Sequence, residues 1–451
     1  MPGARRYWLD SLPAVWWNDL RRNEAILCEN RMPLRCQRCK RAMVDDFVFA
    51  DPTSFRGQLE RGRGIAVHRA ADQPDAADVI YRCVVEDSRW DHQVEERHSY
   101  LARLIHRLEL ALTPLEENLY TAPEAEDIWL TLAVLGTLPF VGRTDAADML
   151  QRYAVDGQHW VDAMDAISSI GSWKMYGSLD RLADRIVGGH TDAELAEAVG
   201  TAEPWLTFAR TQPRIAALLN DLEGRRKGRS LLRGPGPEGV EHVDLVERVY
   251  ATRDRERRDA LKELGRSGDL RLLGLAADPA LRNGVGWVPG MPPALDLLGD
   301  KAVHAARQWV EDDDSTLVDL GIGVLSKHGD HRDGPVLLAD VSKAVEAEAW
   351  CVLELPARGL GRIGYSDATN TLLHVWEVTV HSLSRAAVLE GLAGCSPNVA
   401  EGLAVEALDD CEEAVQRSGC KLAPSTPTVV RKLAQLRDDP LASGVHQAAT
   451  E

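Results

Sequence analysis

The chain has 451 residues, 45% of them hydrophobic and 27% charged, with a formal net charge of −18 at pH 7. This length is too great for one compact core, so we expect two or three domains or an elongated repeat array. Residues 1–110 sum to about +1 and residues 111–451 to about −19. Nucleic-acid affinity depends on Lys and Arg that neutralise phosphates, so the acidic part disfavours general nucleic-acid binding.

The composition predicts an all-α protein. Leu, Ala, Asp and Arg dominate, only 8 Tyr and 5 Phe are present, and no sustained alternation of β-branched residues is visible. The first residues lack the apolar stretch of a signal peptide. The most apolar segment, 128–141, contains Pro139 and is too short to span a bilayer, so we expect a buried helix there. Scattered cysteines predict a cytoplasmic protein without membrane association.

Three tryptophans, Trp8, Trp16 and Trp17, lie near the start of a predicted amphipathic helix. Trp8 and Trp16 are two helical turns apart and share a face. They either form a cap that seals the first repeat or present an aromatic anchor to a partner. We therefore treat them as candidate partner-binding residues.

The densest basic cluster follows, and it comprises Arg31, Arg35, Arg38, Lys40 and Arg41. With four later arginines the cluster offers a site for a phosphate-bearing or acidic partner; these are Arg56, Arg61, Arg63 and Arg69. The alternative is that these side chains are solvated or form ion pairs with the acidic part of the chain. The first five join the tryptophans as candidate partner-binding residues.

One Cys-x-x-Cys pair, Cys36 and Cys39, has further thiol and imidazole groups around it in the sequence: Cys28, His68 and Cys83. Structural zinc sites usually pair two such knuckles, whereas this segment has one. Buried, unreactive thiols are the favoured interpretation, and we predict no metal and no cofactor.

Repetition is the most informative feature of the sequence. Residues 126–154 align with residues 155–183, so apolar positions superpose on apolar positions; Leu132, Leu135, Leu138 and Val141 fall on Val161, Met164, Ile167 and Ile170. Gly142 falls on Gly171, and Leu150 and Tyr153 fall on Leu179 and Leu182. Apolar residues three apart mark one helix face, and the glycines mark helix ends. A helix pair that recurs at about 30 residues is typical of an α-solenoid.

The second half of the chain repeats this arrangement less regularly. Predicted helices end at Gly329, Gly364 and Gly394, and each is followed by a second apolar group. Asp278 and Pro279 predict a helix start, with Asp as the N-cap and Pro at the first helical position. The acidic run 311–314 precedes a helix that we expect to begin near Ser315, where the helix dipole favours negative charge.

These features resemble the HEAT-repeat family, in its short bacterial form known as PBS-lyase HEAT-like repeats. The residues that carry the resemblance are the segment 278–282, the run Arg385-Ala386-Ala387 with Leu389, and the glycine-terminated helices. It covers roughly residues 124–187 and 258–420. The resemblance implies an α-solenoid of degenerate helix pairs and commonly a binding role. It transfers no catalytic residues.

We accordingly predict four regions. Residues 1–221 form an N-terminal helical repeat domain, less regular before about residue 120, and residues 241–422 form a C-terminal HEAT-like solenoid. Between them, residues 222–240 are rich in Gly, Pro and Arg. We predict that this segment is an exposed linker, because its Gly and Pro residues disfavour a continuous helix. Residues 423–451 form a tail with a short helix near 429–436 and a frayed end.

Two function classes remain open. The first is a non-enzymatic scaffold or adaptor that binds another protein, with a basic segment as the expected target of the acidic chain. The alternative is a HEAT-like DNA glycosylase, which would need a basic groove. The motifs of hydrolases, P-loop proteins and dinucleotide-binding proteins are missing from suitable contexts. The scaffold is therefore the favoured hypothesis.

Overall fold

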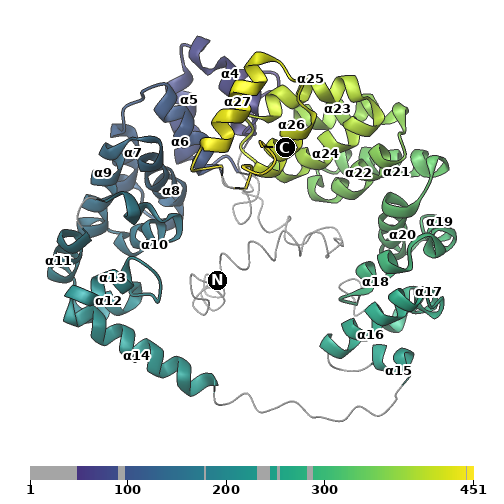
Figure 1. Ribbon diagram of the computed structural model, residues 1–451, viewed down its shortest axis with the longest axis horizontal. Coiled ribbons are helices and arrows are strands. Elements are labelled where there is room, and N and C mark those ends of the chain that lie inside the picture. The colour runs from purple at the N-terminus through teal and green to yellow at the C-terminus, as the bar shows by residue number, and fades with distance from the viewer. Residues whose placement is uncertain are drawn as a thin grey trace. The chain divides into compact units, whose positions relative to one another are not determined.

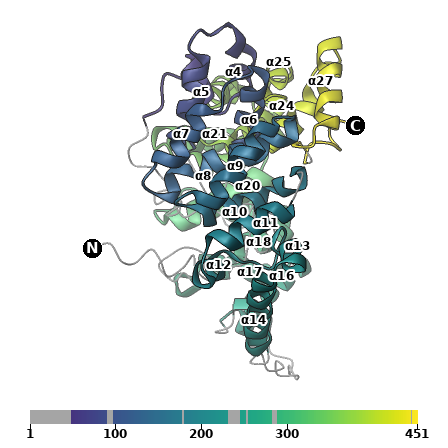
Figure 2. The ribbon, with the colours of Figure 1, turned by 90° about the vertical axis from the view of Figure 1, so that its left-hand side faces the viewer.

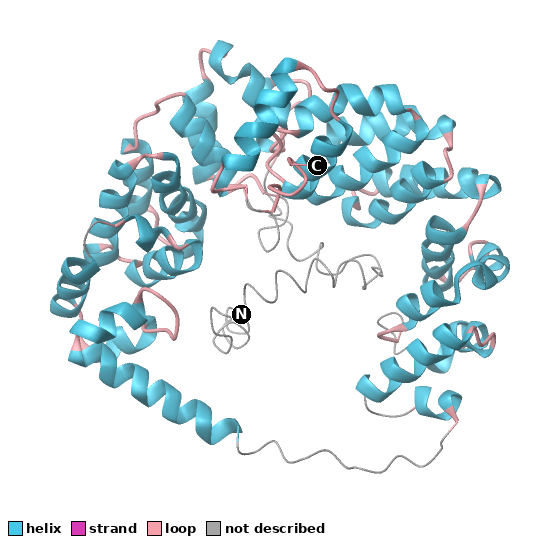
Figure 3. Cartoon of the chain, viewed as in Figure 1, coloured by secondary structure: helices cyan, strands magenta, loops and turns pink. Residues whose placement is uncertain are grey.

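The computed structural model describes residues 48–89, 97–176, 179–230, 244–250, 254–281, 288–442 and 444–450. Its regular structure is helical, and no strand occurs within these ranges (Figure 3). The predicted all-α class is thereby confirmed. Among the same residues, no helix combines the length and the apolar character that crossing a membrane requires.

The chain divides into two compact units. Among the described residues, unit 1 contains 67–88, 97–176 and 179–230, and unit 2 contains 48–66, residue 89 and everything from 244 onward. Unit 2 is therefore assembled mainly from two parts of the chain, 48–66 and the residues from 244 onward, that are separated in sequence by unit 1. The short helix α4 (Gly64–Arg69) runs from the first part of unit 2 into unit 1.

Unit 1, where it is described, is a succession of helices that Figure 1 labels in chain order. They are α5 (Ala76–Val85), α6 (His98–Arg107), α7 (Thr113–Thr121), α8 (Trp129–Thr137), α9 (Thr144–Asp156), α10 (Trp160–Ile170), α11 (Leu179–Gly189), α12 (Asp192–Ala198), α13 (Trp205–Thr211) and α14 (Pro213–Ser230). Each even-numbered helix from α6 to α14 packs against the next even-numbered one, and Figure 2 presents α6, α8 and α10 in this order.

The repeat recognised in residues 126–183 corresponds to two helix pairs, α8–α9 and α10–α11. Helix α8 continues as a 3-10 turn, Leu138–Val141, and ends at Gly142, where φ is 95°. Helix α10 ends at Gly171 with φ of 76°. Both glycines adopt the left-handed conformation that side chains disfavour, which confirms their predicted role as helix terminators. Most of the aligned apolar side chains are buried, as in Leu132 and Met164, and the remainder, which include Val161 and Ile170, are partly buried.

Unit 2 contains the short helices α3 (Phe55–Glu60) and α15 (Leu245–Val249) and a long series after them. This series comprises α16 (Asp254–Ser267), α17 (Arg271–Ala277), α18 (Met291–Leu298), α19 (Val303–Trp309), α20 (Ser315–His328), α21 (Gly334–Glu346), α22 (Glu354–Arg362), α23 (Thr369–Val378), α24 (Ser382–Cys395), α25 (Pro397–Ala407), α26 (Glu413–Leu422) and α27 (Pro427–Asp438).

Helices of unit 2 pack in two layers. Every even-numbered helix from α16 to α24 packs against the next even-numbered helix, and each from α16 to α26 packs against the odd-numbered helix before it, as Figure 1 shows for α20, α22 and α24. We call α16, α18, α20, α22, α24 and α26 the even layer, and their partners α15 to α25 the odd layer. One continuous apolar core runs through both layers from Val249 to Val415. Each helix pair thus buries its apolar surface on its neighbours.

Local sequence signals position helix α20 as expected, whereas the helix start predicted at Asp278 and Pro279 gives a shorter element. Helix α20 begins at Ser315, and the Asp314 carboxylate caps it by accepting a hydrogen bond of 2.8 Å from the amide of Thr316. Asp278 accepts a hydrogen bond of 2.9 Å from the amide of Ala280. The described residues after it form only a 3-10 turn, Pro279–Leu281.

Two segments that the sequence predicts to interrupt or end a helix are helical in the structure. Residues 222–230 belong to α14, which is 18 residues long, so the linker predicted for 222–240 is wrong in its first part; residues 231–243 lie outside the described residues. A glycine inside a helix costs only about 1 kcal/mol relative to alanine, which a helix of this length tolerates. Gly394 also lies inside a helix, α24, and does not end it.

The expected tail contains the predicted helix but is not frayed within the described residues. Helix α27 is capped by Thr426, whose side chain accepts a hydrogen bond from the amide of Val429. Leu436, Ala442 and Val445 are buried in one cluster with Leu408. The C-terminal segment is therefore packed onto unit 2.

Candidate functional site

Polar side chains occupy corresponding places on consecutive helices of the even layer. Nζ of Lys327 on α20 donates to Oδ2 of Asp296 on α18 across 2.9 Å. Nε of Arg358 on α22 donates to Oε2 of Glu390 on α24 across 2.7 Å. The hydroxyl of Ser418 on α26 donates to the other oxygen of Glu390 across 3.2 Å. We call these five residues the polar ladder.

The ladder follows the repeat period of the chain. The bonded members are 31, 32 and 28 residues apart in sequence. Each of these helix pairs therefore places one polar side chain at the same level of the even layer, and three of the four steps between successive positions are joined by hydrogen bonds. These contacts supplement the buried apolar core between successive helices.

The ladder is interrupted between α20 and α22. The corresponding residues there are Lys327 and Arg358, two cations that repel each other and cannot share a hydrogen bond. These helices are joined instead by Arg362, whose guanidinium donates to the carbonyl oxygens of Ser326 (3.0 Å) and Gly329 (2.7 Å). The interruption leaves Lys327 bonded on its α18 side.

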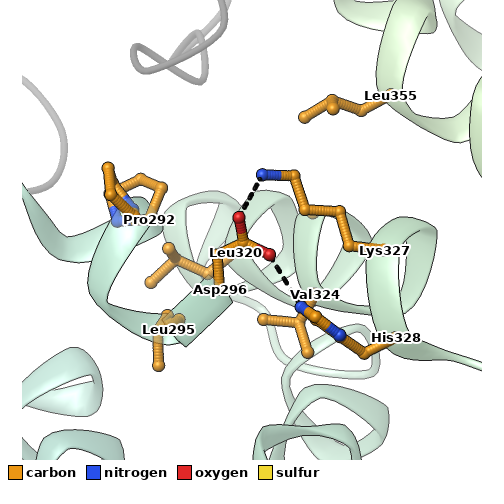
Figure 4. A pocket seen from close by; sticks show the side chains of 10 residues that line it. Pro292, Leu295, Asp296, Leu320, Val324, Lys327, His328 and Leu355 are labelled. Carbon is orange, nitrogen blue, oxygen red and sulfur yellow. Dashed lines mark hydrogen bonds and ion pairs between the residues drawn. The ribbon is translucent and has the colours of Figure 1, made fainter. Parts of the chain in front are cut away.

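A pocket lies beside the Asp296–Lys327 pair, lined by residues of α18 and α20 and by one residue of α22. Its lining combines an apolar surface with three polar side chains: Pro292, Pro293, Leu295, Leu320, Gly323, Val324 and Leu355 with Asp296, Lys327 and His328. In Figure 4 the Asp296 carboxylate lies between Lys327 and His328, and Leu355 projects from the neighbouring helix. The cavity volume is about 40 Å³, which is enough for a few water molecules or the end of one side chain.

The Asp296 carboxylate is held by two donors. Besides Lys327, Nε2 of His328 lies 2.7 Å from its Oδ1. Burial alone would raise the pKa of Asp296, but the hydrogen bonds and charges of Lys327 and His328 together outweigh it and lower this pKa. Asp296 is thus a fixed anion at neutral pH, and its chemistry suits recognition and positioning more than proton transfer.

We expect the Asp296→Ala variant to lose about 1 kcal/mol of unfolding free energy at pH 7. The value is small because Asp296 and Lys327 are each 40% exposed, so water screens their attraction. The folded-state pKa of Asp296 lies below the unfolded value, so this stabilisation is present above about pH 4 and is lost as pH falls below it. Urea denaturation from pH 7 to pH 3 measures the difference. The control is Asp300→Ala, at a carboxylate that is 94% exposed, and an equal loss in both variants would contradict the role of Asp296.

The candidate partner-binding residues predicted from the sequence lie outside the described residues. They are Trp8, Trp16, Trp17, Arg31, Arg35, Arg38, Lys40 and Arg41, and their roles stay predictions. Two of the later arginines, Arg61 and Arg63, are buried in unit 2 and bond to backbone carbonyls and to Glu406. For Arg63, which pairs with Glu406, the alternative of an intramolecular ion pair is correct, whereas the guanidinium of Arg61 donates to backbone carbonyl oxygens.

Two of the five residues considered as zinc ligands lie within the described part of the chain. Cys28, Cys36 and Cys39 lie outside the described residues, while Cys83 is buried in α5 and His68 is exposed on α4. In the described part of the chain, no group of three or more His, Cys, Asp or Glu side chains is arranged to hold a metal ion.

Sequence reasoning missed the pocket because it aligned apolar positions only. The usable signal was the recurrence of polar residues at the repeat period, with Asp296, Lys327 and Arg358 evenly spaced along the chain. Two like charges in neighbouring positions of such a series indicate an interruption. The comparison with known proteins adds no assignment: no family model, no curated protein and no solved structure matches this chain.

Proposed function

We propose that the protein is a non-enzymatic, protein-binding scaffold of the HEAT-like α-solenoid type, and that the even layer of unit 2 is a binding face. The observation that carries the proposal is the pocket beside the Asp296–Lys327 pair of the polar ladder. It joins apolar side chains of three successive even-numbered helices, α18, α20 and α22, to a fixed polar group. Such a combination is typical of the pockets that accept an anchoring side chain of a partner protein.

The size of the pocket supports protein binding over small-molecule catalysis. Ligand sites usually enclose about 300–1,000 Å³, far more than the roughly 40 Å³ available here. The low pKa of Asp296 also differs from that of a general base, which works best when it titrates near neutral pH. The glycosylase alternative loses support, because Arg61 and Arg63 are already bonded within unit 2.

The partner is proposed to be a protein that carries a basic segment. The net charge of −18 gives the chain a field that attracts cationic partners and repels polyanions. A basic segment beside an apolar anchor would use both the long-range field and the pocket. Binding should therefore weaken as salt screens the charges, with the anchor retaining part of the affinity.

The test compares three full-length baits in native lysate: the wild type and two variants. We expect Leu355→Asp, which places a charge in the pocket lining, to lose at least about tenfold of the captured partner relative to the wild type. Val336→Asp is the matched control, because Val336 is 37% exposed on α21 in the odd layer. Capture by quantitative mass spectrometry at low and high salt is the measurement. Capture of the same proteins by all three baits, or of none above background, contradicts the proposal.

A further inference from the structure

The first described residues of unit 2, 48–66, pack against helices from the opposite end of the chain. We call residues 48–66 the strap. It lies in unit 2 with α23 to α26, although two of its bonds join positions that are 317 and 343 apart in the sequence. Its contacts centre on four consecutive residues, Arg61-Gly62-Arg63-Gly64. Each of the four residue types is needed at its position for a different structural reason.

The two arginines bond to separate acceptors. Nε of Arg61 donates to the carbonyl oxygen of Val378 at the end of α23 across 3.1 Å. Arg63 forms a bidentate pair with Glu406 on α25, with distances of 2.8 and 3.0 Å. Both guanidinium groups are buried, with 6% of each residue exposed. A lysine could not reproduce the bidentate geometry at Glu406.

The two glycines are required by backbone geometry. Gly62 has φ of 68°, a left-handed conformation, and its carbonyl oxygen accepts a hydrogen bond of 2.9 Å from the amide of Cys411. At Gly64 a Cβ atom would lie 1.9 Å from the carbonyl oxygen of Glu406. Any side chain at position 64 would therefore push the strap away from α25.

The surface that receives these residues is organised by its own interactions. Arg385 on α24 forms a bidentate pair with Asp410, at 2.8 and 2.9 Å, and neither side chain is exposed. The same guanidinium lies 3.5 Å from the carbonyl oxygen of Gly62. Asp410 is fixed further by the amide of Glu412 and, through its carbonyl oxygen, by Gln416. With Asp410 engaged in this way, Glu406 is the carboxylate that pairs with the strap.

We propose that this surface, formed by Val378, Arg385, Glu406 and Cys411, is a docking site for an Arg-Gly-Arg-Gly peptide, which the strap occupies within the same chain. A partner protein that presents the same four residues displaces the strap. The site recognises guanidinium groups and glycine backbone, which any chain of that sequence supplies equally well. It lies on α23 to α26, away from the pocket on α18 to α22, so it does not depend on the scaffold proposal.

Covalent attachment gives the strap an advantage over any competitor. A tethered segment has an effective concentration of about millimolar, so a free peptide binds the intact chain weakly. Weakening the strap removes this competition. Glu406 then retains its carboxylate without the Arg63 guanidinium, and it should take a guanidinium from solution because a buried, unpaired charge is costly.

The test uses full-length protein and a fluorescent peptide of residues 51–66. We expect the peptide to bind the Arg61→Ala/Arg63→Ala chain at least about tenfold more tightly than the wild type, as measured by fluorescence anisotropy. Circular dichroism confirms that the variant is folded. The control peptide carries Lys at both arginine positions, so it keeps the charge and loses the bidentate geometry. Equal binding to both chains, or equal binding of the lysine peptide, overturns the proposal.

Amide hydrogen exchange of the wild-type chain is a second test of whether a peptide displaces the strap, and it needs no variant. Millimolar peptide should speed exchange of the strap amides at least about tenfold, while the Cys411 amide stays protected because the peptide replaces its Gly62 acceptor. Strap amides that exchange as slowly as those of α24, with or without peptide, would show that the strap is a permanent part of the core and would overturn the proposal.

Discussion

The Gly394→Ala variant is expected to lose about 3 kcal/mol of unfolding free energy, measured by urea denaturation at pH 7. A Cβ atom at position 394 would lie 1.9 Å from the carbonyl oxygen of Gly361. The oxygen belongs to the backbone of α22, and the Cβ position is fixed by its bond to the backbone of α24, so no side-chain rotation can relieve the contact. The two helices would have to move apart, and the apolar contacts between them would be lost along the even layer.

Gly402→Ala is the matched control, because Gly402 lies within α25 and a Cβ atom there meets nothing within 4 Å. Alanine in an open helical position should stabilise the chain by about 0.5–1 kcal/mol, since it lowers the entropy of the unfolded state. The two variants therefore differ in sign. If Gly394→Ala were as well tolerated as Gly402→Ala, the close crossing of α22 and α24 would be wrong.

Gly394 also illustrates why only part of the fold can be predicted from the sequence. A glycine that ends a helix and a glycine that allows two helices to touch look alike in sequence. Gly142 and Gly171 end helices because their φ angles are positive, whereas Gly394 continues α24 and faces Gly361. Local periodicity therefore predicts the helix pairs, and the three-dimensional contact decides what each glycine does.

Long-range contacts were beyond sequence reasoning for a different reason. The pair Arg63–Glu406 joins residues 343 positions apart, and neither residue lies in a local pattern that names its partner. The sequence therefore grouped residues 48–66 with the N-terminal half, whereas their contacts belong to unit 2. The polar ladder was recoverable, because Asp296, Lys327 and Arg358 recur at the repeat period. An alignment of the apolar positions alone does not reveal these polar residues.

The second large effect is expected at the buried pair of Arg385 and Asp410. The Arg385→Met variant should lose about 3–5 kcal/mol of unfolding free energy at pH 7, because it leaves the Asp410 carboxylate buried without its cation. Methionine retains much of the arginine stem, so packing changes little. Urea denaturation of the full-length variant measures the loss.

The dependence of this loss on pH separates the charge from the packing. Burial raises the pKa of Asp410 against the attraction of Arg385, and removing Arg385 raises it further. A group whose folded-state pKa exceeds its unfolded value favours folding at low pH and disfavours it as pH rises through the folded pKa. The deficit of Arg385→Met should therefore shrink as pH falls from 7 toward 4, because protonation of Asp410 removes its buried charge.

The double variant Arg385→Met/Asp410→Asn completes the argument. Asparagine removes the charge and keeps an oxygen that can accept the hydrogen bond from the amide of Glu412, so we expect recovery of at least about half of the loss. The double variant should also lose the pH dependence, because its position 410 no longer titrates. A double variant as unstable as Arg385→Met, at every pH, would mean that lost packing and not an unpaired charge causes the effect. Recovery would instead show that the pair adds little net stability when both charges are present, whereas removal of Arg385 alone is strongly destabilising. The role of the pair would then be to specify the fold.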